Sequence, residues 1–218
     1  MNDGFKLQLA IEHKCERSQV VRRGLIKAKY IGFGLVLAMG LCTPQIWAGE
    51  DCGYVTNGNF EVASADDATI PAGWFLFFSK NKTMALSQVA PRAGSNCLKM
   101  SAQDVKGANM GIGQTISVDD GKTYTFTVYV MSNPETPLTR GVYGMIGIEW
   151  KDSTGKEIYR TASPEWDPSL SRMRWELRRV SDKAPRGAKT ATMTISLYDG
   201  DNGGLGSCFV DDAEVEMK

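Results

Sequence analysis

Apolar and polar residues alternate with a period of two in four separate segments of this 218-residue chain. Period two is typical of β-strands, because successive side chains of a strand point to opposite faces of its sheet. The segments read TYTFTVYV (123–130), GMIGIEW (144–150), RWELRRVS (174–181) and ATMTISLY (191–198). Turn-forming clusters such as SNPETP and DGDNGG separate them, and no segment keeps a helical period. The pattern predicts an all-β fold, an antiparallel β-sandwich, with no internal repeat and no second domain.

In these segments, alternate residues form two sets that differ in chemistry. One is apolar and is expected to face the core, whereas the other mixes tyrosines with small hydroxyl residues. The expected core side chains are Tyr124, Phe126, Val128, Val130, Ile146, Ile148, Trp150, Met193, Ile195 and Leu197. The expected outward side chains are Thr125, Thr127, Tyr129, Tyr143, Met145, Glu149, Thr192, Thr194, Ser196 and Tyr198. If the strands are neighbours, the outward side chains form one polar surface that carries flat rings.

Residues 1–48 have the pattern of an export signal. The segment is basic, with seven Lys and Arg against three Asp and Glu, and an apolar run follows at 31–42. Ile46 and Ala48 suit signal-peptidase cleavage before Gly49. The twelve apolar residues are fewer than the roughly 20 that span a bilayer, so a membrane anchor is not expected. The general secretory route and the twin-arginine route, for which RRGLIK is the candidate motif, both stay open.

The expected mature chain, residues 49–218, is therefore one domain exported to the periplasm or the extracellular space. It carries 18 Lys and Arg and 22 Asp and Glu, so its net charge of −4 implies no basic face for nucleic acid. The single histidine, His13, belongs to the leader. Ser-His-Asp catalysis, Cys-His catalysis and zinc sites built on imidazole are thereby excluded for the mature protein.

Three cysteines survive the expected cleavage: Cys52, Cys97 and Cys208. In an oxidising compartment two of them are expected to pair, which leaves one free thiol or one link to a partner. Their spacing fits no zinc motif.

Several short motifs follow one another in an order that resembles the jelly-roll carbohydrate-binding modules of families 4, 9 and 22. They are NGNFE (57–61), PAGW (71–74), GSNCLKM (94–100), GQTISVDDGKTYTFTVYV (113–130), IGIEWKDSTG (146–155), APRGAKTATMTISL (184–197) and FVDDAEVE (209–216). The ordered set covers nearly all of residues 49–218. The resemblance implies a jelly-roll sandwich, related to galactose-binding domains, whose first and last strands lie near each other.

The resemblance also implies a structural calcium near the ends of those strands. Its ligands by position are the main-chain carbonyls of Asn59 and Gly94 and the side chain and carbonyl of Asp211. Glu61 is either a further carboxylate ligand or a carboxylate that supports the ligands without contacting the ion. Calcium prefers several hard oxygens, which broken strands can supply. The alternative is a plain turn before a buried Phe60, with the acids only protecting a sheet edge.

The disulfide that the resemblance implies joins Cys97 to Cys208, next to the metal. The competing pair is Cys52–Cys208, which also joins segments near the two chain ends. Cys52 is free or intermolecular in the first case.

The resemblance implies a sugar-binding cleft on one sheet, where rings stack on sugars and short polar groups meet their hydroxyls. By position, Phe77 is the stacking aromatic and Gln114 a polar cleft residue. Strand parity adds Tyr129, Tyr143, Ser196 and Tyr198. Each has a simpler interpretation, because Phe77 also suits a core and outward tyrosines are common on strands.

The leading hypothesis is a secreted, monomeric, non-catalytic protein that binds polysaccharide or oligosaccharide chains. The first alternative is a jelly-roll glycoside hydrolase or polysaccharide lyase, with Glu149 and either Glu157 or Asp152 as the two carboxylates. The second alternative is a structural or adhesive surface protein, since an alternating Tyr/Thr face also suits protein contacts.

Overall fold

Residues 54–77 and 83–218 are described here from a computed structural model. They form ten strands: β1 Phe75–Phe77, β2 Met84–Ser87, β3 Cys97–Ser101, β4 Asn109–Ser117, β5 Thr123–Ser132, β6 Tyr143–Lys151, β7 Glu157–Ala162, β8 Glu176–Lys183, β9 Thr190–Tyr198 and β10 Ser207–Met217. Within these ranges there is no helix with the length and apolar character to cross a membrane. The expected export signal and Cys52 lie outside the described residues.

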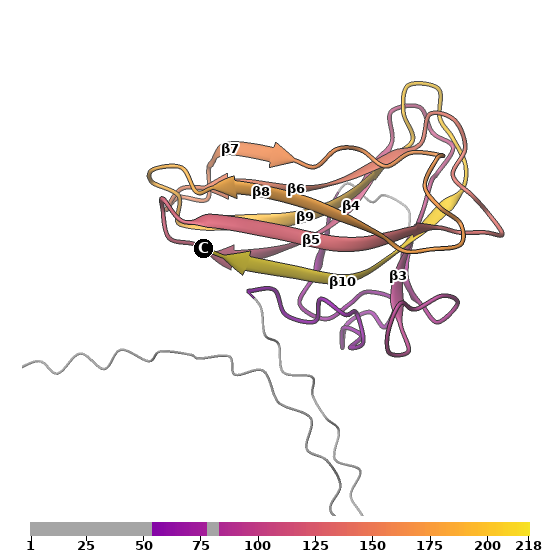
Figure 1. The fold of residues 1–218 in the computed structure, drawn as a ribbon, viewed down its shortest axis with the longest axis horizontal. Coiled ribbons are helices and arrows are strands. Elements are labelled where there is room, and N and C mark those ends of the chain that lie inside the picture. Colours follow the sequence, from indigo (N-terminus) through magenta and orange to yellow (C-terminus); the bar gives the residue numbers. More distant parts are fainter. Residues whose placement is uncertain (1–53, 78–82) are drawn as a thin grey trace, which may run out of the picture. The chain divides into compact units, whose positions relative to one another are not determined.

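The strands form two five-stranded antiparallel sheets stacked as two layers (Figure 1). Sheet I has the order β1-β4-β9-β6-β7, and sheet II has the order β2-β3-β10-β5-β8. From β3 to β10 the chain changes sheet at every connection except the β6–β7 hairpin. Neighbouring strands therefore come from distant parts of the sequence. The predicted all-β, antiparallel sandwich of the jelly-roll type is confirmed.

The core between the sheets consists of the side chains that the alternation assigned to it. All ten predicted core side chains are at most 1% exposed. Tyr124 and Trp150 pack edge to face with ring centroids 5.7 Å apart, and the Trp150 indole nitrogen donates to Asp182 at 3.2 Å. Burying a large apolar side chain stabilises the fold by about 1.5–3 kcal/mol. The alternation is thus the dominant signal that selects this fold.

The outward side chains do not form one surface, because β5 lies in sheet II whereas β6 and β9 are neighbours in sheet I. Tyr129 of β5 therefore lies on the far side of the sandwich from Tyr143 and Tyr198. The Tyr129 ring lies under the guanidinium of Arg92, 3.6 Å from its centroid, and Arg92 also pairs with Asp212. The single surface expected from three adjacent strands is thus limited to two of them.

The NGNF stretch turns the chain before it reaches the first strand. Asn57 and Phe60 both have left-handed backbone conformations, with φ of 50° and 56°. The Asn57 side chain bonds Val62 in both directions, at 2.8 and 3.0 Å, and so holds the turn. Phe60 is fully buried next to Trp74. The turn also meets the last strand, because Ala213 donates its amide to the Gly58 carbonyl at 2.8 Å, as the resemblance implied.

The Cys97–Cys208 disulfide is absent, and this prediction is wrong. Strands β3 and β10 are paired, but Cys208 lies opposite Met100 and faces the core. Cys97 belongs instead to a small apolar cluster with Phe209 on the outer face of sheet II. The two thiols thus lie on opposite faces and cannot meet, because adjacent positions along a strand alternate. Both are free, and desolvation raises the pKa of each to about 12.

Candidate functional site

The outer face of sheet I carries a shallow cleft. Its volume is about 60 Å³, so a ligand would lie along the sheet rather than be enclosed. The lining residues are Phe77, Met145, Gly147, Glu149, Arg160, Thr161, Ala162, Thr194, Ser196 and Tyr198.

A pair of stacked tyrosines marks one end of the cleft. Tyr143 and Tyr198 are direct cross-strand partners on β6 and β9. Their rings are nearly parallel, with an interplanar angle of 8° and centroids 4.8 Å apart. Desolvation, assisted by Glu165, raises the pKa of the Tyr143 hydroxyl above its usual value. The pair therefore offers a flat apolar surface whose Tyr143 hydroxyl remains protonated and able to donate.

Two glycines on β4 let phenyl rings lie close to the sheet. A Cβ on Gly111 would be 2.1 Å from the Phe77 ring, and one on Gly113 would be 3.0 Å from the Phe75 ring. Phe75 and Phe77 themselves lie with centroids 6.4 Å apart. Any larger residue at Gly111 would displace Phe77, so the glycine positions the aromatic side of the cleft.

Short hydroxyl side chains form the floor between the rings. Thr194 and Ser196 lie on β9, the central strand of sheet I, and are only 7% and 5% exposed. Ser196 faces Gly111 on one neighbour and Met145 on the other. Such groups can exchange hydrogen bonds with sugar hydroxyls without filling the cleft.

Paired charges form the other end. Glu149 is 3.4 Å from Arg160 and 3.6 Å from Lys151, and Arg160 makes a two-pronged contact with Glu157. The hydrogen bond from Arg160 is the leading cause of the lowered pKa of Glu157. Both carboxylates are thus paired with cations, and the lowered pKa of Glu157 is the reverse of the raised pKa that a general acid needs. Asp152 lies in a turn, where its carboxylate accepts hydrogen bonds from residues 154 and 156.

The cleft gathers four of the six residues predicted to bind ligand. Phe77, Ser196 and Tyr198 line it, and Tyr143 is stacked on Tyr198. Gln114 lies elsewhere: its amide faces the core side of β4 and bonds the main chain of Thr56 and Gly73.

Tyr129, the sixth predicted ligand-binding residue, lies on sheet II beneath Arg92. Sequence reasoning did not assign Arg160 to the cleft. Sequence reasoning also overlooked the alternating Gly111 and Gly113, which were the one sequence signal for the flat aromatic surface.

Three of the four predicted calcium ligands meet at one loop, residues 92–96: Gly94 is part of the loop, and Glu61 and Asp211 bond to it. Glu61 Oε1 accepts hydrogen bonds from the amides of residues 95–96, each at 2.9 Å. Gly94 has φ of +67°, and a Cβ there would be 2.2 Å from the same oxygen. Asp211 Oδ2 accepts a hydrogen bond from the Arg92 amide at 2.8 Å. The loop therefore brings Glu61, Gly94 and Asp211 together.

The chemistry of this donor set fits calcium. Asp211 is fully buried, and desolvation raises its pKa to about 6, so an ion that neutralised this carboxylate would stabilise the folded protein. In the described ranges no three His, Cys, Asp or Glu side chains gather closely enough to hold a metal. Main-chain carbonyls, such as those of Asn59 and Gly94, would have to complete the shell, and calcium accepts them readily.

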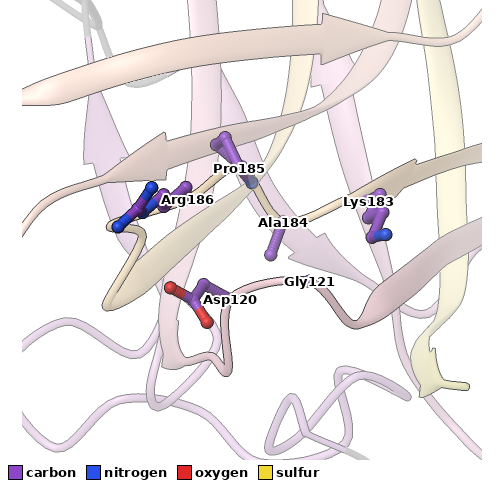
Figure 2. A pocket seen from close by; sticks show the side chains of 6 residues that line it. All are labelled: Asp120, Gly121, Lys183, Ala184, Pro185 and Arg186. Atoms are coloured by element: carbon purple, nitrogen blue, oxygen red, sulfur yellow. The ribbon is translucent and has the colours of Figure 1, made fainter.

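A second hollow lies at the end of the sandwich where β5 begins and β8 ends (Figure 2). It is lined by Asp120, Gly121, Lys183, Ala184, Pro185 and Arg186. The hollow has charges of both signs and no aromatic ring. It therefore lacks the stacking surface of the cleft on sheet I.

The sequence matches no protein-family model and no curated relative. Solved structures with the same fold include a family 61 carbohydrate-binding module in complex with β-1,4-galactotriose. It is 17% identical with a TM-score of 0.50, over 76% of this chain and 99% of that one. A second is the enzymatically active domain of tailspike protein 4 of bacteriophage CBA120, which is 14% identical with a TM-score of 0.55. That match covers 76% of this chain, which spans only 21% of the tailspike chain.

A third is a cyclase from Fischerella sp. TAU in complex with 4-(1H-indol-3-yl)butan-2-one. It is 13% identical with a TM-score of 0.51, over 75% of this chain and 96% of that one. The predicted carbohydrate-binding-module type of jelly roll is thus confirmed as a fold. The same fold also occurs in an enzyme of similar length.

Proposed function

We propose that this protein binds a polysaccharide or oligosaccharide chain along the cleft on sheet I and does not cleave it. The observation that carries the proposal is that Tyr198, on which Tyr143 is stacked, lines one groove together with Phe77 and Ser196. The proposal is also supported by the likeness of the fold to a carbohydrate-binding module.

Three kinds of group in the cleft would contact the glycan: aromatic rings, short hydroxyl side chains and the guanidinium of Arg160. Pyranose rings have an apolar face, so the ring of Phe77 and the tyrosine pair give them flat surfaces to stack on. Ser196 and Thr194 meet sugar hydroxyls. Arg160, whose side chain is 62% exposed, donates at the rim.

The pairing of charges supports binding without catalysis. Glycoside hydrolysis needs one carboxyl group that is protonated near neutral pH. Glu149 and Glu157 are both paired with Arg160, and the hydrogen bond from Arg160 lowers the pKa of Glu157. The two acids therefore fix the position of Arg160 and do not serve as an acid–base pair.

The proposal includes a structural calcium ion and export. Asn59, Glu61, Gly94 and Asp211 would hold the ion, which would neutralise the buried Asp211 carboxylate and tie the first turn to β10. Cleavage before Gly49 would release the domain to the periplasm or the extracellular space as a monomer. The mass of the exported protein tests the cleavage site directly.

A panel of soluble neutral and acidic polysaccharides in affinity gel electrophoresis tests the function. We expect the purified protein to be retarded by at least one glycan class and to release neither reducing ends nor unsaturated products from it. Product formation that Glu149→Gln abolishes would instead make the protein an enzyme. Capture of a protein partner together with indifference to every glycan would favour a structural or adhesive role.

A further inference from the structure

One buried acidic side chain has an oxygen without a partner. Asp199, the residue after β9, is fully buried. Its Oδ2 accepts hydrogen bonds from the amides of Gln103 and Val105, at 2.8 and 3.0 Å. Its Oδ1 has no hydrogen-bond partner among the described residues. A buried carboxylate oxygen without a donor is costly, and native structures usually meet such an oxygen with a water or a cation.

Oxygen atoms of neighbouring loops lie close to the segment that begins with this residue. The two amides that bond Asp199 flank Asp104, so the carboxylate lies under the loop that carries the Asp104 side chain. A Cβ on Gly203 would be 3.1 Å from Asp104 Oδ1. A Cβ on Gly141 would be 3.0 Å from the Gly203 carbonyl oxygen, and one on Gly200 would be 2.3 Å from that of Gly141.

The glycines are what allow these loops to approach one another so closely. Gly141, Gly200 and Gly203 all have positive φ, between 69° and 96°. The carbonyls of Gly141 and Gly203 accept no main-chain hydrogen bond within the described ranges. Loops 102–108 and 199–206 are fastened to each other by main-chain hydrogen bonds, such as Asp104 to Gly204 at 3.0 Å. Carboxylate and carbonyl oxygens of three connections thus lie in one tightly packed region that includes the main chain of Asp199.

We propose that these loops bind a calcium ion through Asp199 Oδ1, the Asp104 carboxylate and the main-chain carbonyls of Gly141 and Gly203. The site is separate from the loop at residues 92–96, because its ligands belong to the connections β3–β4, β5–β6 and β9–β10. Asp104 is exposed, so this side of the proposed site is accessible from solvent.

Calcium fits this donor set better than other common ions. No three acidic, His or Cys side chains meet here or elsewhere in the described ranges, so carbonyl oxygens must supply much of the shell. Zinc favours His and Cys ligands, and magnesium demands a near-ideal octahedron and keeps its waters. Calcium accepts six to eight mixed oxygens in irregular geometry.

The site adjoins the glycan cleft. Asp199 directly follows Tyr198, and Asp201 contributes to the raised pKa of the Tyr143 hydroxyl. An ion that fixes residues 199–203 would also fix the stacked tyrosines. This coupling rests on the proposed function, whereas the calcium site itself does not.

Calcium titration of chelator-treated protein by isothermal titration calorimetry tests the site. Asp199→Asn keeps the size of the side chain and one acceptor oxygen, and we expect it to lose one calcium equivalent. Asp104→Asn should weaken the same binding event at least about tenfold. Asp104 has φ of 56°, which asparagine tolerates, so this variant should fold even if Asp199→Asn does not.

Asp120→Asn is the matched control and should leave the titration unchanged. Asp120 follows the end of β4, which pairs with the start of β9, whereas Asp199 follows the end of β9. Unchanged calcium stoichiometry and affinity in Asp104→Asn and in any folded Asp199→Asn would overturn the proposal, because Asp199 Oδ1 would then face only a water or a shared proton. The titration contains no glycan. Calcium binding without any glycan binding would therefore contradict the proposed function and leave this site intact.

Discussion

The ring of Phe77 lies so close to the main chain at Gly111 that a Cβ there would be 2.1 Å from it. Gly111→Ala must therefore displace the ring. Because Phe77 lies at the surface of sheet I, the displacement should cost glycan affinity more than stability. We expect binding to weaken about fivefold or more, which corresponds to a loss of about 1 kcal/mol. Calorimetric titration with the glycan that the parent protein binds best measures this loss of affinity.

Gly155→Ala is the control for a general effect of replacing glycine. Gly155 lies in the turn before β7, and a Cβ added there would have no atom within 4 Å beyond its two chain neighbours. The substitution should reduce stability slightly, because Gly155 has φ of 81°, and leave glycan affinity unchanged. Equal affinity in Gly111→Ala and the parent protein would show that Phe77 does not contact the ligand.

Tyr198→Ala should remove half of the stacked ring pair and lower glycan affinity about fivefold or more. Tyr129→Ala removes the same ring from sheet II, where it supports Arg92, and should leave affinity unchanged. Affinity gels of the two variants side by side give the comparison. A larger loss of glycan affinity in Tyr129→Ala than in Tyr198→Ala would show that the glycan binds to sheet II.

The alternation of side chains was sufficient to predict the core, because facing in or out is a local property of a strand. The assignment of each strand to a sheet was not predictable in this way, since pairing depends on segments far apart in the sequence. Tyr129 has the same parity pattern as Tyr143 and Tyr198, yet the chain crosses to the other sheet between β5 and β6. Only three of the six predicted binding residues therefore line the cleft, and Tyr143 is stacked on one of them.

Two predictions based on the resemblance, those for Gln114 and for the Cys97–Cys208 disulfide, conflict with the alternation of side chains along their strands. On β4, Gln114 has the same parity as Ile112 and Ile116, which places its side chain toward the core. On β3 and β10, Cys97 and Cys208 have opposite parities relative to the core. Position in a motif therefore located the strands correctly, whereas parity decided where the side chains point.

Chelation should lower the melting temperature, because an ion bound only by the folded state stabilises that state. Calcium at about a hundred times its Kd adds about 2.7 kcal/mol, and each kcal/mol shifts Tm by about 2–4 °C in a domain of this size. Asp211→Asn should shrink the difference between calcium and chelator, as measured by scanning calorimetry. Asp120→Asn should preserve the Tm difference between calcium and chelator. Equal Tm values of the parent protein with calcium and with chelator would contradict the proposal of a structural calcium ion.

The buried thiols predict a loss of stability at alkaline pH. In the unfolded chain a cysteine loses its proton near pH 8.5, whereas burial raises the pKa of Cys97 and Cys208 to about 12 in the folded protein. Above pH 8.5 the unfolded state therefore binds fewer protons, so its free energy falls relative to the folded state. The stabilising effect is complete below pH 8.5 and declines as the pH rises toward 12. The urea midpoint should accordingly fall between about pH 8 and pH 10.5.

The double variant Cys97→Ala/Cys208→Ala isolates this effect from lysines and tyrosines that titrate in the same range. Its midpoint should start lower, because two buried side chains are truncated, but it should fall less steeply with pH than that of the parent. Alkylation at about pH 8 followed by peptide mapping gives a second readout. The Cys97 and Cys208 peptides should be unmodified in the native protein and modified in urea. Native labelling of Cys208 would show that the core around β10 opens to solvent.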